Sequence, residues 1–172
     1  MVFMRNISLV GFMGTGKTTV GKVLAKRLGY TFVDCDDEIE KGQGTTISHI
    51  FSEFGEPYFR ELEKNMVAKL SARQGLVISA GGGAVMDPAN MENMKKGGPV
   101  ICLSATPEVI LKRVERFTHR PLLQVPDPLA KIKELLEARG PFYAKADFTV
   151  DTGGLGPDKV VDKIIELVGG KL

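Results

Sequence analysis

An eight-residue stretch near the start of the chain, Gly11–Thr18, fits the pattern G-x-x-x-x-G-K-[ST]. It follows an apolar run, Ile7–Val10, that is typical of a strand, and it precedes Thr19–Leu28, where apolar residues recur at helical spacing. Strand, glycine loop and helix in this order form a phosphate site, because glycine N–H groups and a helix N-terminus both attract phosphate oxygens. A plain glycine-rich turn is the alternative, and the Lys-Thr pair that ends the pattern argues against it. The chain is therefore expected to bind a nucleoside triphosphate.

The residues of this loop have separate expected roles. Lys17 is expected to reach the β- and γ-phosphates of ATP, and Thr18 is expected to offer its hydroxyl to Mg²⁺. Further contacts with the nucleotide are expected from Gly14, Thr15, Gly16 and Thr19.

The composition is that of an ordinary globular chain with little excess charge. The 172 residues are most simply one domain, and 23 basic against 21 acidic residues leave a net charge of only +2, which argues against a nucleic-acid-coating protein. The uncharged stretch Gly75–Met86 is too short and too rich in glycine to span a bilayer. The N-terminal apolar residues run directly into the phosphate loop, so no cleaved signal peptide is expected. We expect a cytoplasmic monomer without nucleic-acid or membrane partners.

The cysteines and histidines indicate neither a disulfide scaffold nor a metal site. Cys102 lies in the apolar run Val100–Leu103 and is expected to be an inert core residue. Cys35 lies between two aspartates, in a position that could be accessible, but nothing marks it as a nucleophile. His49 and His119 lie far apart in the chain, so a zinc site is not expected.

Short apolar runs alternate with amphipathic helical patterns along the chain. This alternation predicts parallel strands joined by right-handed crossovers, with helices on both faces of the sheet. In such sheets, ligands bind beyond the carboxyl ends of the strands. The predicted strands are Ile7–Val10, Thr31–Val33, Leu76–Ser79, Val100–Leu103 and Phe148–Val150. The predicted helices are Lys17–Leu28, Glu56–Arg73, Pro107–Arg116, Leu129–Arg139 and Pro157–Val168.

Two connections look like additions to this sheet. Residues 36–60 hold several glycines and many charges, and could form a small substrate-holding region. Residues 116–128 hold three prolines and two arginines, and a basic connection near a phosphate site is a candidate for a closing lid. Arg113, Arg116 and Arg120 flank or lie in this segment, where an arginine could offset charge on the γ-phosphate. A solvated charged surface is the alternative for Arg116.

Two aspartates follow the second predicted strand and admit two interpretations. If the backbone stays extended, Asp34 and Asp36 point to the same side and could serve Mg²⁺ and a substrate hydroxyl. Alternatively, Asp36 is the N-cap of a short helix over Asp37–Lys41. The spacing alone does not decide between these interpretations.

Two arginines and a run of glycines are further candidates for a substrate site. Arg60 faces Glu56 and Glu63 on a predicted helix, which an ordinary surface ion-pair ladder explains. Arg139 ends a predicted helix, where a basic side chain complements the helix dipole. For both arginines the spacing favours these structural interpretations over ligand binding. Gly81–Gly83 follow the third predicted strand and would let a ligand approach the backbone closely.

Six short sequence strings along the chain indicate a family when their order and spacing are considered together. They are GFMGTGKT (11–18), FVDCDDEIE (32–40), IFSEFGEPYFRELE (50–63), GGGAV (81–85), RPLL (120–123) and RGPFY (139–143). Together they resemble the shikimate kinase family over essentially the whole chain. The resemblance implies one kinase domain over residues 1–172, with a three-layer α/β/α fold of the P-loop kinase type and a five-stranded parallel sheet. It also implies a substrate-binding region at about residues 34–63 and a mobile lid at about 115–128.

The resemblance further implies an activity: Mg²⁺- and ATP-dependent phosphorylation of the 3-hydroxyl of shikimate, a step of aromatic amino-acid biosynthesis. Arg60 and Arg139 would then bind the shikimate carboxylate, since guanidinium groups bind carboxylates bidentately. Asp36 would bind ring hydroxyls and orient or deprotonate the attacking one. The backbone at Gly81 and Gly82 would complete the pocket.

For the nucleotide, the resemblance implies contacts beyond the phosphate loop. Asp34 would serve the metal ion together with the loop threonine. Arg120 would act in catalysis with the loop lysine, by stabilising the phosphoryl group during transfer. Arg113 and Pro157 would lie against the adenine.

The alternatives to a shikimate kinase are kinases for other phosphate acceptors and a different class of nucleotide-binding protein, the GTPases. A gluconate kinase also needs a carboxylate site, so Arg60 and Asp36 alone do not exclude it, although the family strings favour shikimate. A nucleoside monophosphate kinase would usually carry an Asp-Gly-[Tyr/Phe]-Pro-Arg string, which is absent. A GTPase switch is suggested by Asp151–Gly154, which fits D-x-x-G, and by Ala144–Asp147, which mimics N-K-x-D. Their order is reversed and the asparagine is missing, which excludes that class.

Overall fold

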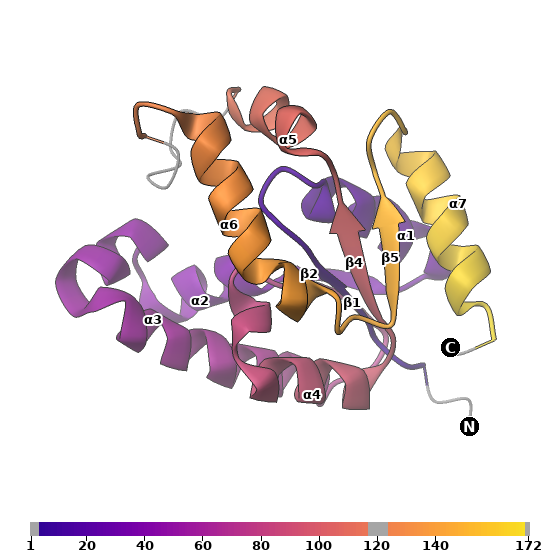
Figure 1. Ribbon diagram of the computed structural model, residues 1–172. Helices are drawn as coiled ribbons and strands as arrows, with labels where there is room; N and C mark the ends of the chain where they lie inside the picture. The colour runs from indigo at the N-terminus through magenta and orange to yellow at the C-terminus, as the bar shows by residue number, and fades with distance from the viewer. Residues whose placement is uncertain (1–3, 117–123, 171–172) are drawn as a thin grey trace.

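Five parallel strands form the centre of the molecule. The computed structural model describes residues 4–116 and 124–170, and the strands lie in the order β2-β3-β1-β4-β5 (Figure 1). The strands are β1 Ile7–Val10, β2 Thr31–Asp34, β3 Leu76–Ser79, β4 Val100–Ser104 and β5 Phe148–Asp151. The prediction of five parallel strands is confirmed, and β2, β4 and β5 each extend one residue beyond the predicted end.

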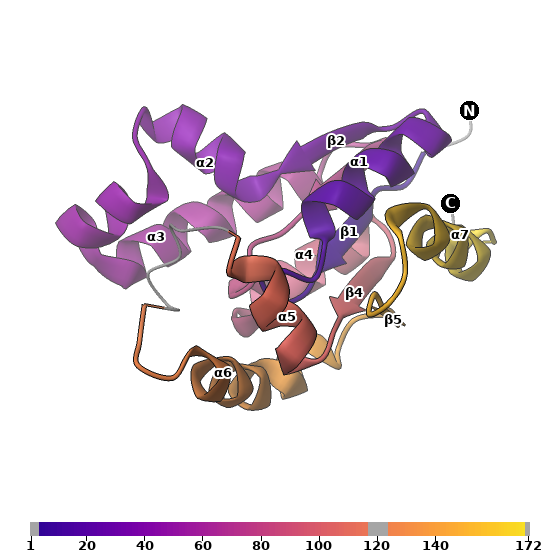
Figure 2. The same ribbon diagram turned by 90° about the horizontal axis from the view of Figure 1, so that it is seen from above.

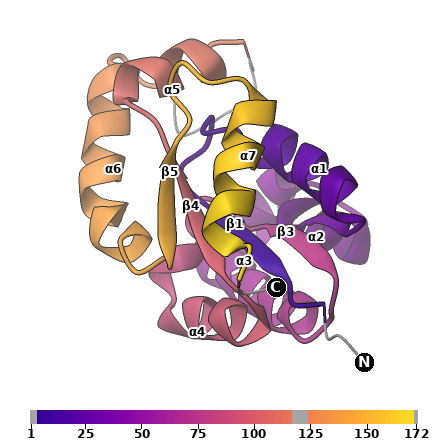
Figure 3. The same ribbon diagram turned by 90° about the vertical axis from the view of Figure 1, so that its right-hand side faces the viewer.

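Helices cover both faces of this sheet. They are α1 Lys17–Leu28, α2 Cys35–Gln43, α3 Ile47–Ser71, α4 Pro88–Gly97, α5 Pro107–Val114, α6 Pro128–Tyr143 and α7 Pro157–Val168, with a short 3₁₀ helix, η1, over Ala84–Met86. Helices α1 and α7 pack on one face, and α3, α4, α5 and α6 contribute to the core on the other (Figure 3). The expected three-layer α/β/α fold is therefore confirmed. Within residues 4–116 and 124–170, none of these helices is long and apolar enough to cross a membrane.

The central strands β3, β1 and β4 are buried on both faces, and their successive side chains enter different cores, whereas the edge strands β2 and β5 are partly exposed. In β4, Val100 and Cys102 join the core under α3, α4 and α6, whereas Ile101 and Leu103 join the core under α1 and α7. Because both of their faces are covered, the central strands are mainly apolar runs, as is typical of parallel sheets, whereas β2 and β5 each carry a threonine and end in an aspartate. These apolar runs allowed the strands to be predicted from the sequence.

Residues 36–60, expected to be an inserted region, are mostly helical. Helix α3 begins at Ile47, well before the predicted start at Glu56. Gly55 has non-helical backbone angles inside α3, φ 81° and ψ 169°, and this kink interrupts the helical periodicity of the sequence. Helices α2 and α3 pack together and extend away from the sheet (Figure 2). The small core between them consists of Ile39, Ile50 and Phe59.

Helix α4 was not predicted from the sequence. Its start is conventional: the Asp87 side chain accepts a backbone N–H of the first turn, and Pro88 occupies the first helical position. Its buried face, however, consists of Met91 and Met94 together with a polar residue, Asn90. So short an apolar stripe, interrupted by an amide, gives little helical periodicity to detect.

Three predicted helix C-termini were wrong. Helix α3 ends at Ser71 rather than at Arg73. Helix α5 ends at Val114 rather than at Arg116. Helix α6 continues past Pro141 to Tyr143, so Arg139 lies inside the helix and does not end it. The buried Tyr143 holds this last turn against the sheet core, which overrides the tendency of the proline to end the helix.

The expected lid, at about residues 115–128, is described only at its two ends. Residues 117–123, which include Arg120 and His119, lie outside the described residues. The expectations for the lid and for Arg120 therefore remain predictions.

Candidate active site

The carboxyl ends of the strands carry most of the predicted site residues. The loop Gly11–Gly16 follows β1, Asp34 ends β2, and Gly81–Gly83 follow β3. Since β2, β3 and β1 are consecutive and parallel in the sheet, these three segments lie side by side at one edge. This is the edge at which open parallel sheets bind ligands.

The phosphate loop has a backbone that favours glycine. Gly11, Gly14 and Gly16 have φ angles of 141°, 76° and 98°. A methyl group at Gly11 would also collide with the carbonyl oxygen of Leu103 on β4. Gly16 is the N-cap of α1, and no side chain in the described part of the chain caps this helix. The first N–H groups of α1 are therefore available to an anion.

The side chains of the loop lie where a nucleotide could meet them. Lys17 Nζ donates hydrogen bonds to the carbonyl oxygens of Gly11, at 2.6 Å, and Phe12, at 3.1 Å. The ammonium group therefore lies over the loop, where phosphate oxygens can compete for it. Thr18 and Thr19 are exposed in the first turn of α1.

Asp34, rather than Asp36, is the N-cap of the helix that follows β2. Asp34 Oδ1 accepts hydrogen bonds from the backbone N–H groups of Asp36, at 2.9 Å, and Asp37, at 3.2 Å. The helix, α2, begins already at Cys35, so the alternative interpretation was right about a helix and wrong about its cap. The extended backbone assumed by the other interpretation is also wrong, because Asp36 lies in the first turn of α2.

Asp36 and Glu63 both face the glycine segment that follows β3. A methyl group at Gly81 would lie 3.1 Å from Asp36 Oδ1 and 3.1 Å from Glu63 Oε2. Gly81 therefore allows carboxylates from α2 and α3 to approach the backbone at one point. This brings Asp36 to the same edge of the sheet as the phosphate loop.

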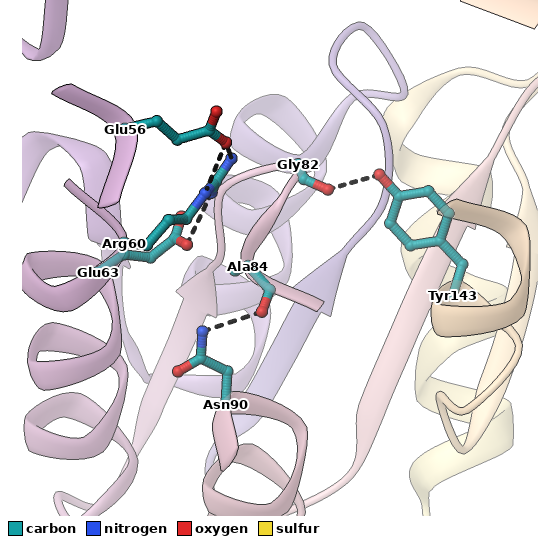
Figure 4. A network of polar contacts seen from close by, with 7 residues as sticks. All are labelled: Glu56, Arg60, Glu63, Gly82, Ala84, Asn90 and Tyr143. Carbon is teal, nitrogen blue, oxygen red and sulfur yellow. Dashed lines mark hydrogen bonds and ion pairs between the residues drawn. The ribbon is translucent and has the colours of Figure 1, made fainter. Parts of the chain in front are cut away.

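Arg60 is held between two carboxylates (Figure 4). Its Nη1 lies 2.8 Å from Glu63 Oε1, and its Nη2 lies 3.2 Å from Glu56 Oε1. The guanidinium also covers the glycine segment, since a methyl group at Gly83 would lie 2.5 Å from Arg60 Nη2. The expected ion pairs are confirmed, but a surface ladder is the wrong description because Glu63 is only 1% exposed. Burial raises the pKa of Glu63, and the charge of Arg60 offsets this only in part.

Arg139 approaches the same glycines from α6. It is 9% exposed, and its guanidinium lies over the Phe12 ring at 5.5 Å from the ring centroid. A methyl group at Gly82 would lie 3.3 Å from Arg139 Nη1. Arg60 and Arg139 thus contact neighbouring glycines of one segment, which the sequence spacing alone did not favour.

Two residues that the sequence did not single out hold the glycine segment in place (Figure 4). Tyr143 donates its hydroxyl hydrogen to the Gly82 carbonyl oxygen at 2.6 Å, and burial raises the pKa of this tyrosine. The Asn90 side chain donates to the Ala84 carbonyl oxygen at 2.9 Å. Tyr143 belongs to the string RGPFY, which was a usable signal, whereas Asn90 lies in the unpredicted α4 and gave none.

Arg113 lies beside the phosphate loop, and Pro157 lies exposed at the first position of α7. Arg113 Nη1 donates to the Gly14 carbonyl oxygen at 3.1 Å, and its Nη2 donates to the Thr152 carbonyl oxygen at 3.0 Å. Thr152 begins the connection that leads from β5 to Pro157. Arg113 therefore joins two loops at the nucleotide end of the site. Arg116 is exposed.

The expectation that Cys35 could be accessible was wrong. Its side chain is 0% exposed, and burial raises its pKa well above the ordinary value. Cys102 is 4% exposed, as expected for a core residue, and burial raises its pKa to about 11. Neither thiol is available as a nucleophile in the folded protein.

A parallel sheet in the order β2-β3-β1-β4-β5, with a phosphate loop after β1, defines a P-loop phosphotransferase-type α/β protein. The model of the family described as "SKI: Shikimate kinase" matches residues 13–169. The chain belongs to the shikimate kinase family. It is 52% identical to the shikimate kinase of Thermodesulfovibrio yellowstonii, over 95% of this chain and 94% of that one.

Solved structures agree with this family. A shikimate kinase from Acinetobacter baumannii in complex with shikimate has a TM-score of 0.91 and 42% identity, covering 96% of this chain and 93% of that chain. A gluconokinase from Sinorhizobium meliloti has a TM-score of 0.60 and 16% identity, covering 97% of this chain and 93% of that chain. At that identity the gluconokinase shows a shared fold alone, so the closer sequence likeness lies with the shikimate kinases.

Proposed function

We propose that the chain transfers the γ-phosphate of ATP to the 3-hydroxyl of shikimate, giving shikimate 3-phosphate and ADP in aromatic amino-acid biosynthesis. The observation that carries this proposal is the placement of Arg60 and Arg139. They come from α3 and α6 and contact Gly83 and Gly82, at the edge of the sheet that also carries the phosphate loop. Two guanidinium groups at one backbone segment suit a substrate with a carboxylate.

Asp36 acts at the hydroxyl end of the acceptor. Its carboxylate faces Gly81, so a ring bound between the arginines and the phosphate loop would present hydroxyls to it. Phosphoryl transfer through a loose transition state needs little base strength, so the main task of Asp36 is to orient the attacking hydroxyl. It can also accept the proton that this hydroxyl loses.

The residues at the nucleotide end fit ATP with Mg²⁺. Lys17 neutralises the β- and γ-phosphates, and Gly14, Thr15, Gly16 and the start of α1 provide backbone N–H groups. Thr18 is exposed beside the loop, and Asp34 keeps a second carboxylate oxygen besides the one that caps α2. Mg²⁺ needs only one or two such ligands because phosphate and water complete its shell. When bound, the ion neutralises charge on the phosphates.

The remaining parts of the proposal rest on the sequence and on the family resemblance. Arg120 stabilises the phosphoryl group during transfer, and residues at about 115–128 form a lid. Arg113 and Pro157 contact the adenine. The chain acts as one kinase domain over residues 1–172, with its acceptor held by the region 34–63. It works as a cytoplasmic monomer.

The acceptor can be identified with an assay that couples ADP release to a spectroscopic signal. Shikimate, quinate, gluconate, AMP and CMP are compared at equal concentrations with saturating Mg²⁺ and ATP. We expect shikimate to give the highest kcat/KM by a wide margin, because a monophosphate lacks the carboxylate and gluconate lacks the rigid ring. A preference for any other acceptor would remove the assignment.

A further inference from the structure

The phosphate loop depends on groups outside itself to satisfy its carbonyl oxygens. In a trans peptide the N–H and C=O point in opposite directions, so a loop that turns an N–H toward phosphate turns the attached C=O away. Such carbonyl oxygens, when buried, need hydrogen-bond donors. For Gly14 the donor is Arg113 Nη1, at 3.1 Å, and for Thr15 it is the Thr152 hydroxyl, at 3.0 Å.

Thr152 is the centre of this arrangement. It is 2% exposed and follows β5 directly. Its hydroxyl oxygen accepts a hydrogen bond from Arg113 Nη1 at 3.0 Å and lies within donating distance of the carbonyl oxygens of Thr15, at 3.0 Å, and Ser104, at 3.1 Å. Its backbone N–H donates to the Ser104 carbonyl oxygen at 2.8 Å, which ties it to the end of β4. One side chain thus contacts the loop after β1, the end of β4 and a cation from α5.

The contact with Thr15 determines which way the next peptide faces. Thr15 and Gly16 share a peptide bond whose carbonyl oxygen lies against Thr152. Its N–H therefore points to the other side, at the N-cap of α1, where a phosphate group would bind. The Thr15 hydroxyl is occupied in turn by the Phe12 carbonyl oxygen at 2.7 Å, so it cannot replace Thr152.

We propose that Thr152 is a positioning residue for the triphosphate: with Arg113 it fixes the carbonyl groups of Gly14 and Thr15 outward and so keeps the N–H of Gly16 directed at the phosphates. The same contacts couple the phosphate loop to the β5–α7 connection. The β5–α7 connection is therefore already positioned when a nucleotide binds the phosphate loop. This inference rests on the proposed use of ATP, but it concerns the triphosphate and not the acceptor.

The test compares Thr152→Val, which keeps the shape and loses the hydroxyl, with Thr152→Ser, which keeps the hydroxyl. Binding of inorganic tripolyphosphate, ATP and shikimate to the full chain is measured by calorimetry in the presence of Mg²⁺. We expect Thr152→Val to weaken tripolyphosphate and ATP about tenfold, since a buried carbonyl loses its donor. Shikimate binding should change less than twofold. Thr152→Ser should stay within about threefold of the unsubstituted chain for every ligand.

Two further variants separate this role from general stability and from adenine binding. Thr149→Val makes the same change at an exposed position of β5 and should leave all three affinities unchanged. Arg113→Lys keeps the positive charge but cannot reach Gly14 and Thr152 together. It should weaken tripolyphosphate, which has no base to stack on Arg113, by several fold. This variant also tests the inference if Thr152→Val fails to fold.

Three results would overturn the inference. The first is that Thr152→Val binds tripolyphosphate as tightly as the unsubstituted chain. The second is that Thr152→Ser loses as much affinity for tripolyphosphate as Thr152→Val does. The third is that Thr152→Val loses as much affinity for shikimate as for tripolyphosphate. The proposed function fails separately. If the chain does not phosphorylate shikimate but its tripolyphosphate binding depends on Thr152, the proposed acceptor is wrong and this inference stands. If the chain phosphorylates shikimate and Thr152→Val leaves nucleotide binding unaltered, the proposed function stands and this inference is wrong.

Discussion

The guanidinium of Arg60 lies 2.8 Å from the carboxylate of Glu63, and the Glu63 side chain is only 2% exposed. A cation proposed to bind the substrate is thus held by a buried anion. Burial lowers the pKa of Arg60, but the charges of Glu63 and Glu56 outweigh it and leave this pKa above its ordinary value. The arginine therefore stays charged, and its position on the glycine segment is fixed before any substrate binds.

Glu63→Gln should remove the part of the pH dependence of the free energy of unfolding that comes from the titration of Glu63. Burial raises the pKa of Glu63 in the folded protein above the ordinary value of 4.5. A raised folded pKa means that the native state holds this proton more tightly than the unfolded chain. The contribution of protonated Glu63 to the free energy of unfolding is therefore fully present below about pH 4.5, and it is lost as the pH rises through the folded pKa. Urea unfolding at several pH values from 4 to 8 should show Glu63→Gln gaining stability relative to the unsubstituted chain over this window.

The matched control for that experiment is Glu61→Gln, an exposed carboxylate on the same helix. Its difference from the unsubstituted chain should be flat over the same pH range. A flat difference for Glu63→Gln as well would mean that the ion pair with Arg60 fully compensates the burial of Glu63.

Arg60→Ala and Arg139→Ala should each weaken shikimate binding by roughly 2–5 kcal/mol, as expected for loss of a buried charge partner. The effect should appear in KM for shikimate and in its dissociation constant, with little change in KM for ATP. Arg73→Ala is the control, since this exposed arginine follows α3 at the opposite edge of the sheet. An unchanged KM for shikimate in both site variants would refute the carboxylate site.

Asp36→Asn should lower kcat about 10²-fold or more while ATP binding survives, because the amide can neither orient the hydroxyl as a carboxylate does nor accept its proton. Asp37→Asn, at the exposed next position of α2, should have nearly normal turnover. Steady-state kinetics at saturating ATP and shikimate measures both. Near-normal kcat in Asp36→Asn would remove this residue from the mechanism.

Neither cysteine should react with a thiol reagent in the native protein at pH 8. Burial raises the pKa of Cys102 to about 11 and that of Cys35 well above its ordinary value, so little thiolate forms. Absorbance after addition of an aromatic disulfide should show no rapid thiol release, and two thiols per chain after unfolding in guanidinium. Rapid modification of Cys35 in the native state would show that the start of α2 opens readily.

The sheet could be predicted because burial makes each strand a short, mainly apolar run, even though the edge strands β2 and β5 are partly exposed. The helices were harder. Helix α4 buries the polar Asn90 beside its two methionines, and α3 bends at Gly55, so in both cases the apolar period is broken although tertiary contacts complete the helix. Helix ends are set by similar contacts, as Tyr143 shows for α6.

The site was predictable where chemistry is local and unpredictable where it depends on distant contacts. The phosphate loop can be recognised from consecutive residues alone, although distant residues, Arg113 and Thr152, complete its hydrogen bonds. Asp36 and Arg139, by contrast, come together only because α2 and α6 both reach the glycines after β3. Spacing alone left Asp36 undecided and favoured a structural role for Arg139, and only the family resemblance pointed to their site roles. Thr152 had appeared in the sequence only as part of a rejected D-x-x-G pattern.

Tyr143→Phe should raise KM for shikimate several fold while leaving KM for ATP unchanged. The substitution removes the 2.6 Å hydrogen bond to the Gly82 carbonyl oxygen and the side-chain hydrogen bond with Arg139, and it keeps the ring that packs in the core. The loss of a donor to a buried acceptor costs about 1–3 kcal/mol. Part of that cost should appear as poorer placement of Gly82 beside Arg139, and hence as weaker acceptor binding. Tyr30→Phe, just before β2 at the far end of the sheet, controls for the loss of a hydroxyl. A fall in melting temperature with both KM values unchanged would assign Tyr143 to folding alone.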